Sequence, residues 1–184
     1  MYIFDMLNSD DYLSEFKKPN TNFFIKGITS NSQEVKPGYI FVALKGASHN
    51  SKDGHDFINQ ALEKQAVLVI AEYKPDNLKI ENLIIVDDSA KAFSYLSEAF
   101  YEWPSRKMKI IGITGTNGKT STSFMLWQIL KYAHKNAKVM GSLGMGDMDN
   151  LTPLTHTTMH ASFIFDRIAD WTVFWNNQIM SWIK

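Results

Sequence analysis

The feature that most constrains the fold is a glycine-containing turn between a β-branched run and a helical pattern. The run Lys109–Thr114 reads as a strand, and apolar spacing from Lys119 to about His134 predicts a helix. The turn between them is Gly115-Thr116-Asn117-Gly118. Glycines let the backbone curl until its N–H groups point inward, where the positive end of the following helix also points. The order strand, loop and helix therefore predicts a parallel α/β sheet with a phosphate-binding loop.

The loop residues suggest MgATP as the ligand. Lys119 is placed to reach the β- and γ-phosphates and is the expected catalytic residue, while the Thr120 hydroxyl is placed to bind Mg²⁺. The strict pattern G-x-x-x-x-G-K-[ST] would need glycine where the chain has Ile113. The expected nucleotide-binding residues are Thr114, Gly115, Thr116, Asn117, Gly118, Lys119, Thr120 and Ser121.

An independent P-loop kinase or NTPase is one alternative. Such a protein needs an acidic residue at the end of a second strand to help hold Mg²⁺. The strand-end candidates, Asp87 and Asp88, precede the loop and belong to the region before it. This alternative therefore fits less well.

Composition excludes several partners. The 19 Lys and Arg residues balance 19 Asp and Glu residues, so no positive field favours nucleic acid or anionic lipid. No apolar run approaches the roughly 20 residues that span a bilayer, and an acidic stretch occupies the start where a signal peptide is basic. The absence of cysteine removes thiolate chemistry. We expect a cytoplasmic protein, a monomer, with no nucleic-acid or membrane partner.

The region before the loop alternates β-rich runs with helical patterns, which predicts a small α/β domain over residues 1–104. Asp88 or Ser89 can cap a helix that Pro104 ends, and Ser105 to Lys107 read as a linker to a second domain, residues 105–184. The expected strands are Phe24–Ile28, Tyr39–Leu44, Val67–Ala71 and Leu83–Val86, and Asp56–Gln65 is an expected helix.

The chain after the expected helix, which ends at about His134, is less regular. Lys138–Met140 is expected to begin the next parallel strand, and the following GSLGMGDMDN reads as a loop. From about residue 161 the tail has two interpretations: an ordinary core helix, or a stretch after a gene interruption or frameshift that was never selected to pack. Its large apolar residues would share one face of a helix: Trp171, Phe174, Trp175, Ile179 and Trp182.

Several segments together resemble the Mur ligase family, in particular its MurE type. The string T-G-T-N-G-K-T resembles that family's phosphate loop. Residues 29–46 are similar to the pattern D-S-R-x-V-x-P-G-x-L-F-x-A-x-x-G, with Asn31 and Gln33 in place of Asp and Arg. Residues 49–58 are similar to H-x-x-x-D-G-x-x-[FY]-I, and residues 155–158 resemble N-T-T-P, with Met159 where proline is usual. The resemblance runs from about residue 25 to 160.

The resemblance implies a small N-terminal α/β UDP-binding domain followed by the start of the family's central P-loop, parallel-sheet domain. It implies ATP-dependent amide-bond formation in peptidoglycan biosynthesis, with UDP-MurNAc-L-Ala-D-Glu and an amino acid, diaminopimelate or lysine, as partners. His55 is expected to be structural or exposed rather than catalytic. The implied substrate-binding residues are Ser32, His49, Asn50 and Ser51 for the UDP part and Thr157 and Thr158 for the muramoyl peptide.

One family segment has no match. The family's M-E-x-S-S-H run supplies a Glu and a His that complete its metal and substrate site, and no such run follows Thr158. We therefore expect a truncated member whose own ligase activity is absent or very weak. A non-catalytic UDP-sugar-binding fragment and a MurF-type ligase are the other readings.

Overall fold

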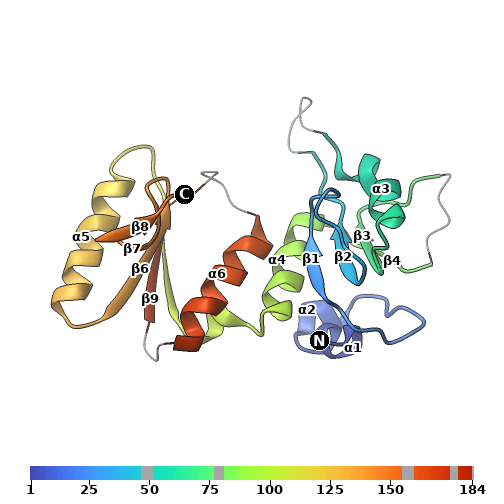
Figure 1. The fold of residues 1–184 in the computed structure, drawn as a ribbon, viewed down its shortest axis with the longest axis horizontal. Coiled ribbons are helices and arrows are strands. Elements are labelled where there is room, and N and C mark those ends of the chain that lie inside the picture. Colours follow the sequence, from blue (N-terminus) through green and yellow to red (C-terminus); the bar gives the residue numbers. More distant parts are fainter. Residues whose placement is uncertain (47–51, 77–80, 155–159, 175–177, 184) are drawn as a thin grey trace. The chain divides into compact units, whose positions relative to one another are not determined.

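The chain forms two compact α/β units, Met1–Glu102 and Trp103–Lys184. The computed structural model describes residues 1–46, 52–76, 81–154, 160–174 and 178–183, with side chains as far as residue 172. Each unit has parallel strands at its centre (Figure 1). Within the described ranges, no helix has the length and apolar character needed to cross a membrane. The predicted α/β class with a parallel sheet is confirmed.

Unit 1 is built on a four-stranded parallel sheet. Its strands pair in the order β1-β2-β3-β4, with Ile40 opposite Leu68 and Ile70 opposite Ile84. Because the strands all run in one direction, their carboxyl ends meet at one edge, where α/β proteins commonly bind ligands. The strands are β1 (Gly27–Thr29), β2 (Tyr39–Val42), β3 (Leu68–Ala71) and β4 (Leu83–Ile85).

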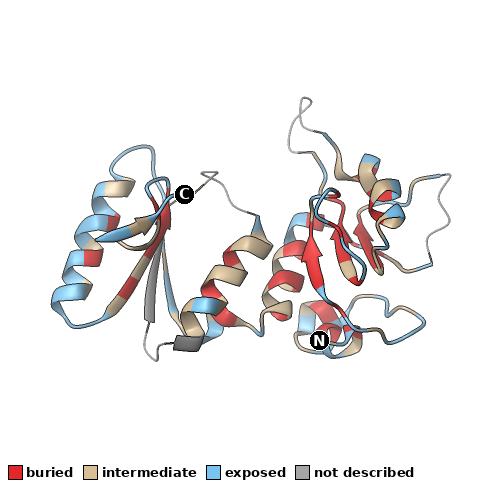
Figure 2. Ribbon diagram, viewed as in Figure 1, coloured by how far each residue is buried: buried red, intermediate tan, exposed pale blue. Residues whose placement is uncertain are grey.

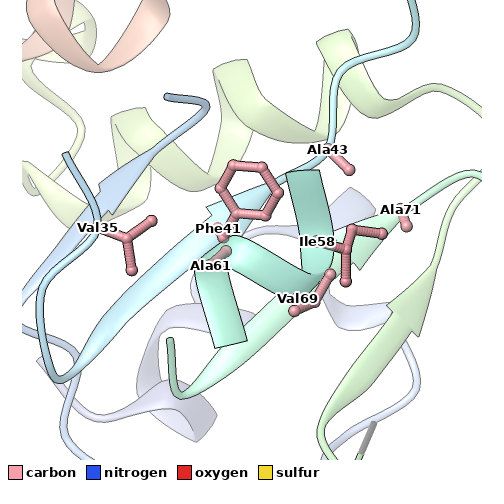
Figure 3. Packing of buried hydrophobic residues seen from close by; sticks show 7 residues of the cluster. All are labelled: Val35, Phe41, Ala43, Ile58, Ala61, Val69 and Ala71. Atoms are coloured by element: carbon pink, nitrogen blue, oxygen red, sulfur yellow. The ribbon is translucent and has the colours of Figure 1, made fainter. Parts of the chain in front are cut away.

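Both faces of this sheet are buried. On β2, Phe41 packs in a cluster with helix α3 (Ile58–Glu63), while its neighbours Ile40 and Val42, which point to the opposite face, are also fully buried. Burial on both faces is typical of parallel sheets. The pattern is visible in Figure 2. Figure 3 shows the α3 cluster, which comprises Val35, Phe41, Ala43, Ile58, Ala61, Val69 and Ala71.

Helix α4 (Ser89–Phe100) contacts β1 and β3 and begins as predicted. The Asp88 side chain accepts a hydrogen bond from the Lys91 backbone N–H at 2.8 Å, which satisfies one of the free donors of the first turn. The predicted helix before β3 begins instead as a 3-10 turn, η1 (Gly54–Phe57), and continues as α3. Two short helices that the sequence analysis missed, α1 (Ile3–Leu7) and α2 (Asp11–Ser14), contact α4.

Unit 2 contains a five-stranded mixed sheet in the order β5-β9-β6-β7-β8. The first three strands are parallel, and the last two form antiparallel hairpins. A 3-10 turn, η2 (Pro104–Lys107), occupies the predicted linker. The strands are β5 (Lys109–Ile113), β6 (Asn136–Gly141), β7 (Gly144–Asp147), β8 (Asn150–Thr152) and β9 (Gln178–Ile183).

Helices cover both faces of the second sheet. Val139 on β6 packs with Trp127 of α5 (Lys119–Tyr132), whereas the next residue, Met140, packs with Ile168 of α6 (Ala161–Phe174). Consecutive residues of a strand point to opposite faces, so α5 and α6 lie on opposite sides of the sheet (Figure 1). The predicted α5 and the strand at Lys138–Met140 are both present.

The prediction of one helix through Trp182 is wrong for Gln178–Ile183. Residues Gln178–Ile183 form β9, which lies between β5 and β6 and pairs in parallel with both. A strand in this position gives its backbone N–H and C=O groups partners on two sides, and this pairing overrides the helical spacing of the aromatic residues. Trp171 does lie in α6 and packs against its cluster, while Trp175 falls outside the described residues.

The predicted loop GSLGMGDMDN contains a pair of hairpins instead. Gly141 pairs with Gly144 and Asp147 with Asn150, so each hairpin turns in two residues. The backbone φ of Gly144 is +135°, and a Cβ there would lie 2.6 Å from the Thr152 carbonyl oxygen. Its glycine therefore marks a close approach between strands and not a loop.

Candidate functional site

The phosphate loop lies between the carboxyl end of β5 and the start of α5, as the sequence predicted. Gly118, the residue before the helix, has a φ of +76°, a conformation that side chains rarely adopt. No side chain caps the N-terminus of this 14-residue helix. Its first N–H groups are therefore available to an anion.

Lys119 folds back over the loop that precedes it. Its Nζ donates to the carbonyl oxygen of Gly115 at 2.5 Å and approaches that of Thr116 at 3.4 Å. The side chains from Thr114 to Asn117 are exposed, and Thr120 is half-buried in the first turn of α5. The site therefore combines an uncapped helix end, a glycine-containing backbone and an adjacent ammonium group. This combination is chemically suited to a nucleoside triphosphate.

The candidate metal ligand is a single hydroxyl, that of Thr120. Among the residues that the structure describes, no group of three or more His, Cys, Asp or Glu side chains is arranged to hold a metal ion. A Mg²⁺ ion at this loop would therefore take its other ligands from the nucleotide phosphates and from water molecules, several of which this ion usually keeps.

The other predicted site residues are divided between described and undescribed segments. Ser32 follows β1 in unit 1 and is only 6% exposed. Its hydroxyl donates to Oε1 of Gln60 on α3 at 2.5 Å, so the oxygen of Ser32 remains only as an acceptor toward a ligand. The remaining predicted residues lie outside the described segments: His49, Asn50, Ser51, Thr157 and Thr158.

A hydrogen-bonded group that the motifs did not reveal lies near the carboxyl edge of the first sheet. His55, in η1, is 4% exposed. Its Nε2 accepts from the backbone N–H of Glu72 at 3.0 Å, so Nδ1 carries the proton and donates to Oδ1 of Asp53 at 2.5 Å. Both ring nitrogens are therefore occupied, in agreement with a structural role.

Tyr73 extends this group to the surface. Its ring stacks on His55 with centroids 3.9 Å apart and an interplanar angle of 6°, and its hydroxyl lies 3.5 Å from Oδ2 of Asp53. Desolvation and the Asp53 charge raise the pKa of Tyr73, so its phenol stays neutral. Desolvation also acts to raise the pKa of Asp53, but hydrogen bonds from the His55 backbone and ring hold it below its usual range.

Glu72 joins the ends of three strands. Its Oε1 accepts from the backbone N–H of Ser89 at 3.1 Å and from the Ser89 hydroxyl at 2.8 Å. Lys45 follows β2, and its Nζ lies 3.8 Å from Oε2 of Glu72. The sequence could have indicated these residues by their positions. Each follows closely after a strand, and parallel strands end at one edge of the sheet.

Two sequence profiles match adjoining parts of the chain. "Mur ligase family, catalytic domain" matches residues 24–108, and "Mur ligase middle domain" matches residues 113–169. The first covers all four strands of the unit 1 sheet, and the second begins at the end of β5 and includes the phosphate loop.

Similar curated proteins share one name, "UDP-N-acetylmuramoyl-L-alanyl-D-glutamate--2,6-diaminopimelate ligase". The protein from Aquifex aeolicus is 43% identical over 119 residues, which are 65% of this chain and 24% of that protein. A protein from Clostridium acetobutylicum, whose name is the same with a final 2, is 35% identical over 165 residues, which are 88% of this chain and 33% of that protein. The chain thus spans about a quarter to a third of the length of these relatives.

Solved structures agree with these matches. A ligase structure with the same name has a TM-score of 0.68 at 27% identity and covers 85% of this chain and 31% of that chain. A MurF ligase from Thermotoga maritima in complex with ADP has a TM-score of 0.53 at 26% identity, over 85% of this chain and 31% of that chain. Because two adjoining profiles and these relatives agree across both units, the chain belongs to the Mur ligase family.

Proposed function

We propose that this chain serves ATP-dependent addition of an amino acid to UDP-MurNAc-L-Ala-D-Glu in peptidoglycan biosynthesis. In this proposal unit 1 holds the UDP end of the substrate and the loop of unit 2 holds MgATP. The observation that carries the proposal is the loop T-G-T-N-G-K-T at the uncapped start of α5, in a chain similar to diaminopimelate ligases. The names of these relatives favour diaminopimelate over lysine as the amine.

The chemistry proposed for this family member has two steps. The substrate carboxylate attacks the γ-phosphorus and ADP leaves, which gives an acyl phosphate; an amine then attacks the acyl carbon, loses a proton and releases phosphate. The part assigned to this chain is positioning and charge neutralisation. Lys119 would leave the Gly115 carbonyl and bind the β- and γ-phosphates, and the first N–H groups of α5 would hold phosphate oxygens.

The assignment of the UDP end to unit 1 rests on the position of Ser32. It follows β1 at the carboxyl edge of the parallel sheet, and its hydroxyl oxygen keeps accepting capacity. His49, Asn50 and Ser51, together with Thr157 and Thr158, are proposed from the resemblance of their segments. The proposed location is the cytoplasm, and the proposed oligomeric state is a monomer.

Binding tests the proposal directly, because the chain spans only part of the relatives' length. Isothermal titration of the full chain with MgATP and with UDP-MurNAc-L-Ala-D-Glu should give saturable binding of both. Lys119→Ala should weaken MgATP binding at least about tenfold, since a charged hydrogen bond contributes roughly 1.5–3 kcal/mol. The same substitution should leave the affinity for the muramoyl dipeptide unchanged.

Lys135→Ala is the matched control, because this lysine is exposed beyond the other end of α5. It should change neither affinity. MgATP binding without binding of the muramoyl dipeptide would favour an ordinary P-loop protein and contradict the proposal.

A further inference from the structure

The ring of Tyr73 is an exposed aromatic surface at the carboxyl edge of the first sheet. Tyr73 is 48% exposed and lies two residues after the end of β3. The other two large aromatic residues exposed in the described part of unit 1, Tyr2 and Phe24, contact each other edge to face and precede β1. Of these three described residues, Tyr73 is therefore the one that lies at the edge where ligands are expected.

The ring is also fixed in place. The buried imidazole of His55 covers one face at a centroid distance of 3.9 Å, and Asp53 contacts both the imidazole and the Tyr73 hydroxyl. His55 is in turn held by the backbone N–H of Glu72. An exposed tyrosine normally loses rotamer freedom when a ligand stacks on it, but this ring is already ordered, so that cost is smaller.

A flat, preordered aromatic surface beside the end of a parallel strand can stack on a planar group, and the planar group of the proposed substrate is its nucleobase. We propose that Tyr73 is the stacking platform for the base of the nucleotide part of the substrate, with His55 and Asp53 as its positioning residues. The inference rests on the proposed function, because it requires that unit 1 bind a uridine nucleotide.

The test compares UDP with 5,6-dihydrouridine diphosphate, which keeps the polar edge of the base but has a saturated, non-planar ring. Titration of the full wild-type chain should favour UDP by about tenfold, in line with the measured contribution of base–aromatic stacking. Tyr73→Leu keeps apolar volume without an aromatic face and should remove this preference. Tyr73→Phe should retain it, because the ring and its stack on His55 remain.

Tyr2→Ala, which alters a similarly exposed tyrosine elsewhere in unit 1, should leave the preference unchanged. Circular dichroism of each variant should confirm that it is folded. If the wild type binds UDP-MurNAc-L-Ala-D-Glu but Tyr73→Leu still favours UDP over the dihydro analogue, the platform is refuted and the proposed function stands. If the wild type binds neither UDP nor the muramoyl dipeptide, both are refuted.

Discussion

At the scale of single residues, one buried hydroxyl in the described part of unit 1 lacks a hydrogen-bond partner. Ser97 lies on α4 and is fully buried, and its hydroxyl has no hydrogen-bond partner among the described residues. Burying a hydroxyl without a partner costs free energy, because the hydrogen bond it makes to water in the unfolded chain is not replaced. The sequence gives no sign of this defect, since a serine at that helical position reads as a neutral choice.

Ser97→Ala should therefore raise the free energy of unfolding by about 1 kcal/mol, the typical cost of an unsatisfied hydroxyl. Urea titration followed by circular dichroism measures this change. The matched control is Ser123→Ala: Ser123 is a buried helix serine whose hydroxyl donates to the Thr120 carbonyl oxygen at 2.9 Å. That substitution should not stabilise the protein, and equal stabilisation by both would contradict the argument.

At the scale of elements, two helices end with the same motif. After α3, Ala66 donates its N–H to the Ala61 carbonyl at 3.0 Å, and after α5, Lys135 donates to Leu130 at 2.8 Å. In each case the preceding residue has a positive φ, 64° at Gln65 and 55° at His134. This is the Schellman ending, in which glycine is the favoured residue.

Gln65→Gly and His134→Gly should each raise the free energy of unfolding by about 0.5–1 kcal/mol. Removing the Cβ relieves the left-handed strain, roughly 1–2 kcal/mol, and this gain exceeds the extra entropy of glycine in the unfolded chain. Lys64→Gly and Ala133→Gly, one position earlier, should lower it because φ is negative there. Chemical denaturation of the four variants decides the matter, and no difference between neighbouring positions would refute it.

Elements with a clear local residue pattern, such as β5 and α5, could be predicted, whereas β7, β8 and β9 could not. The β5–α5 unit follows from a local pattern, because the loop glycines and the helix period are adjacent along the chain. β9 could not be recognised, because what makes Gln178–Ile183 a strand is pairing with β5 and β6, which lie far earlier in the sequence. The site divides in the same way. Lys119 follows from its motif, whereas the contact of Tyr73 with His55 depends on strands that only the fold brings together.

At the scale of the whole molecule, each unit has its own core. The Phe41 cluster lies within unit 1, and the clusters around Trp127 and Ile168 lie within unit 2. The phosphate loop belongs entirely to unit 2, and Ser32 and Tyr73 belong to unit 1. Each proposed ligand would therefore bind to, and stabilise, a unit with its own hydrophobic core.

Calorimetry should accordingly show two thermal transitions that ligands shift separately. A ligand at 100 times its Kd adds about 2.7 kcal/mol to the unit that binds it. MgATP should raise the transition of unit 2 alone, UDP should raise that of unit 1 alone, and Lys119→Ala should remove only the first effect. Assignment of the transitions can follow the near-ultraviolet signal of Trp127, which is buried in unit 2. A single transition moved equally by both ligands would contradict separate cores.

The outer edge of β5 has a practical consequence for handling the protein. Among the described strands, β5 pairs only with β9, and its Ile110 is 40% exposed. A free strand edge is a template for another copy, and a formal net charge of zero offers no overall repulsion between molecules near neutral pH. We expect the exposed Lys109 at the start of this edge to oppose growth of the sheet from chain to chain. Because a pH away from neutral gives the molecules a net charge, we also expect such solutions to favour dispersed molecules over aggregates.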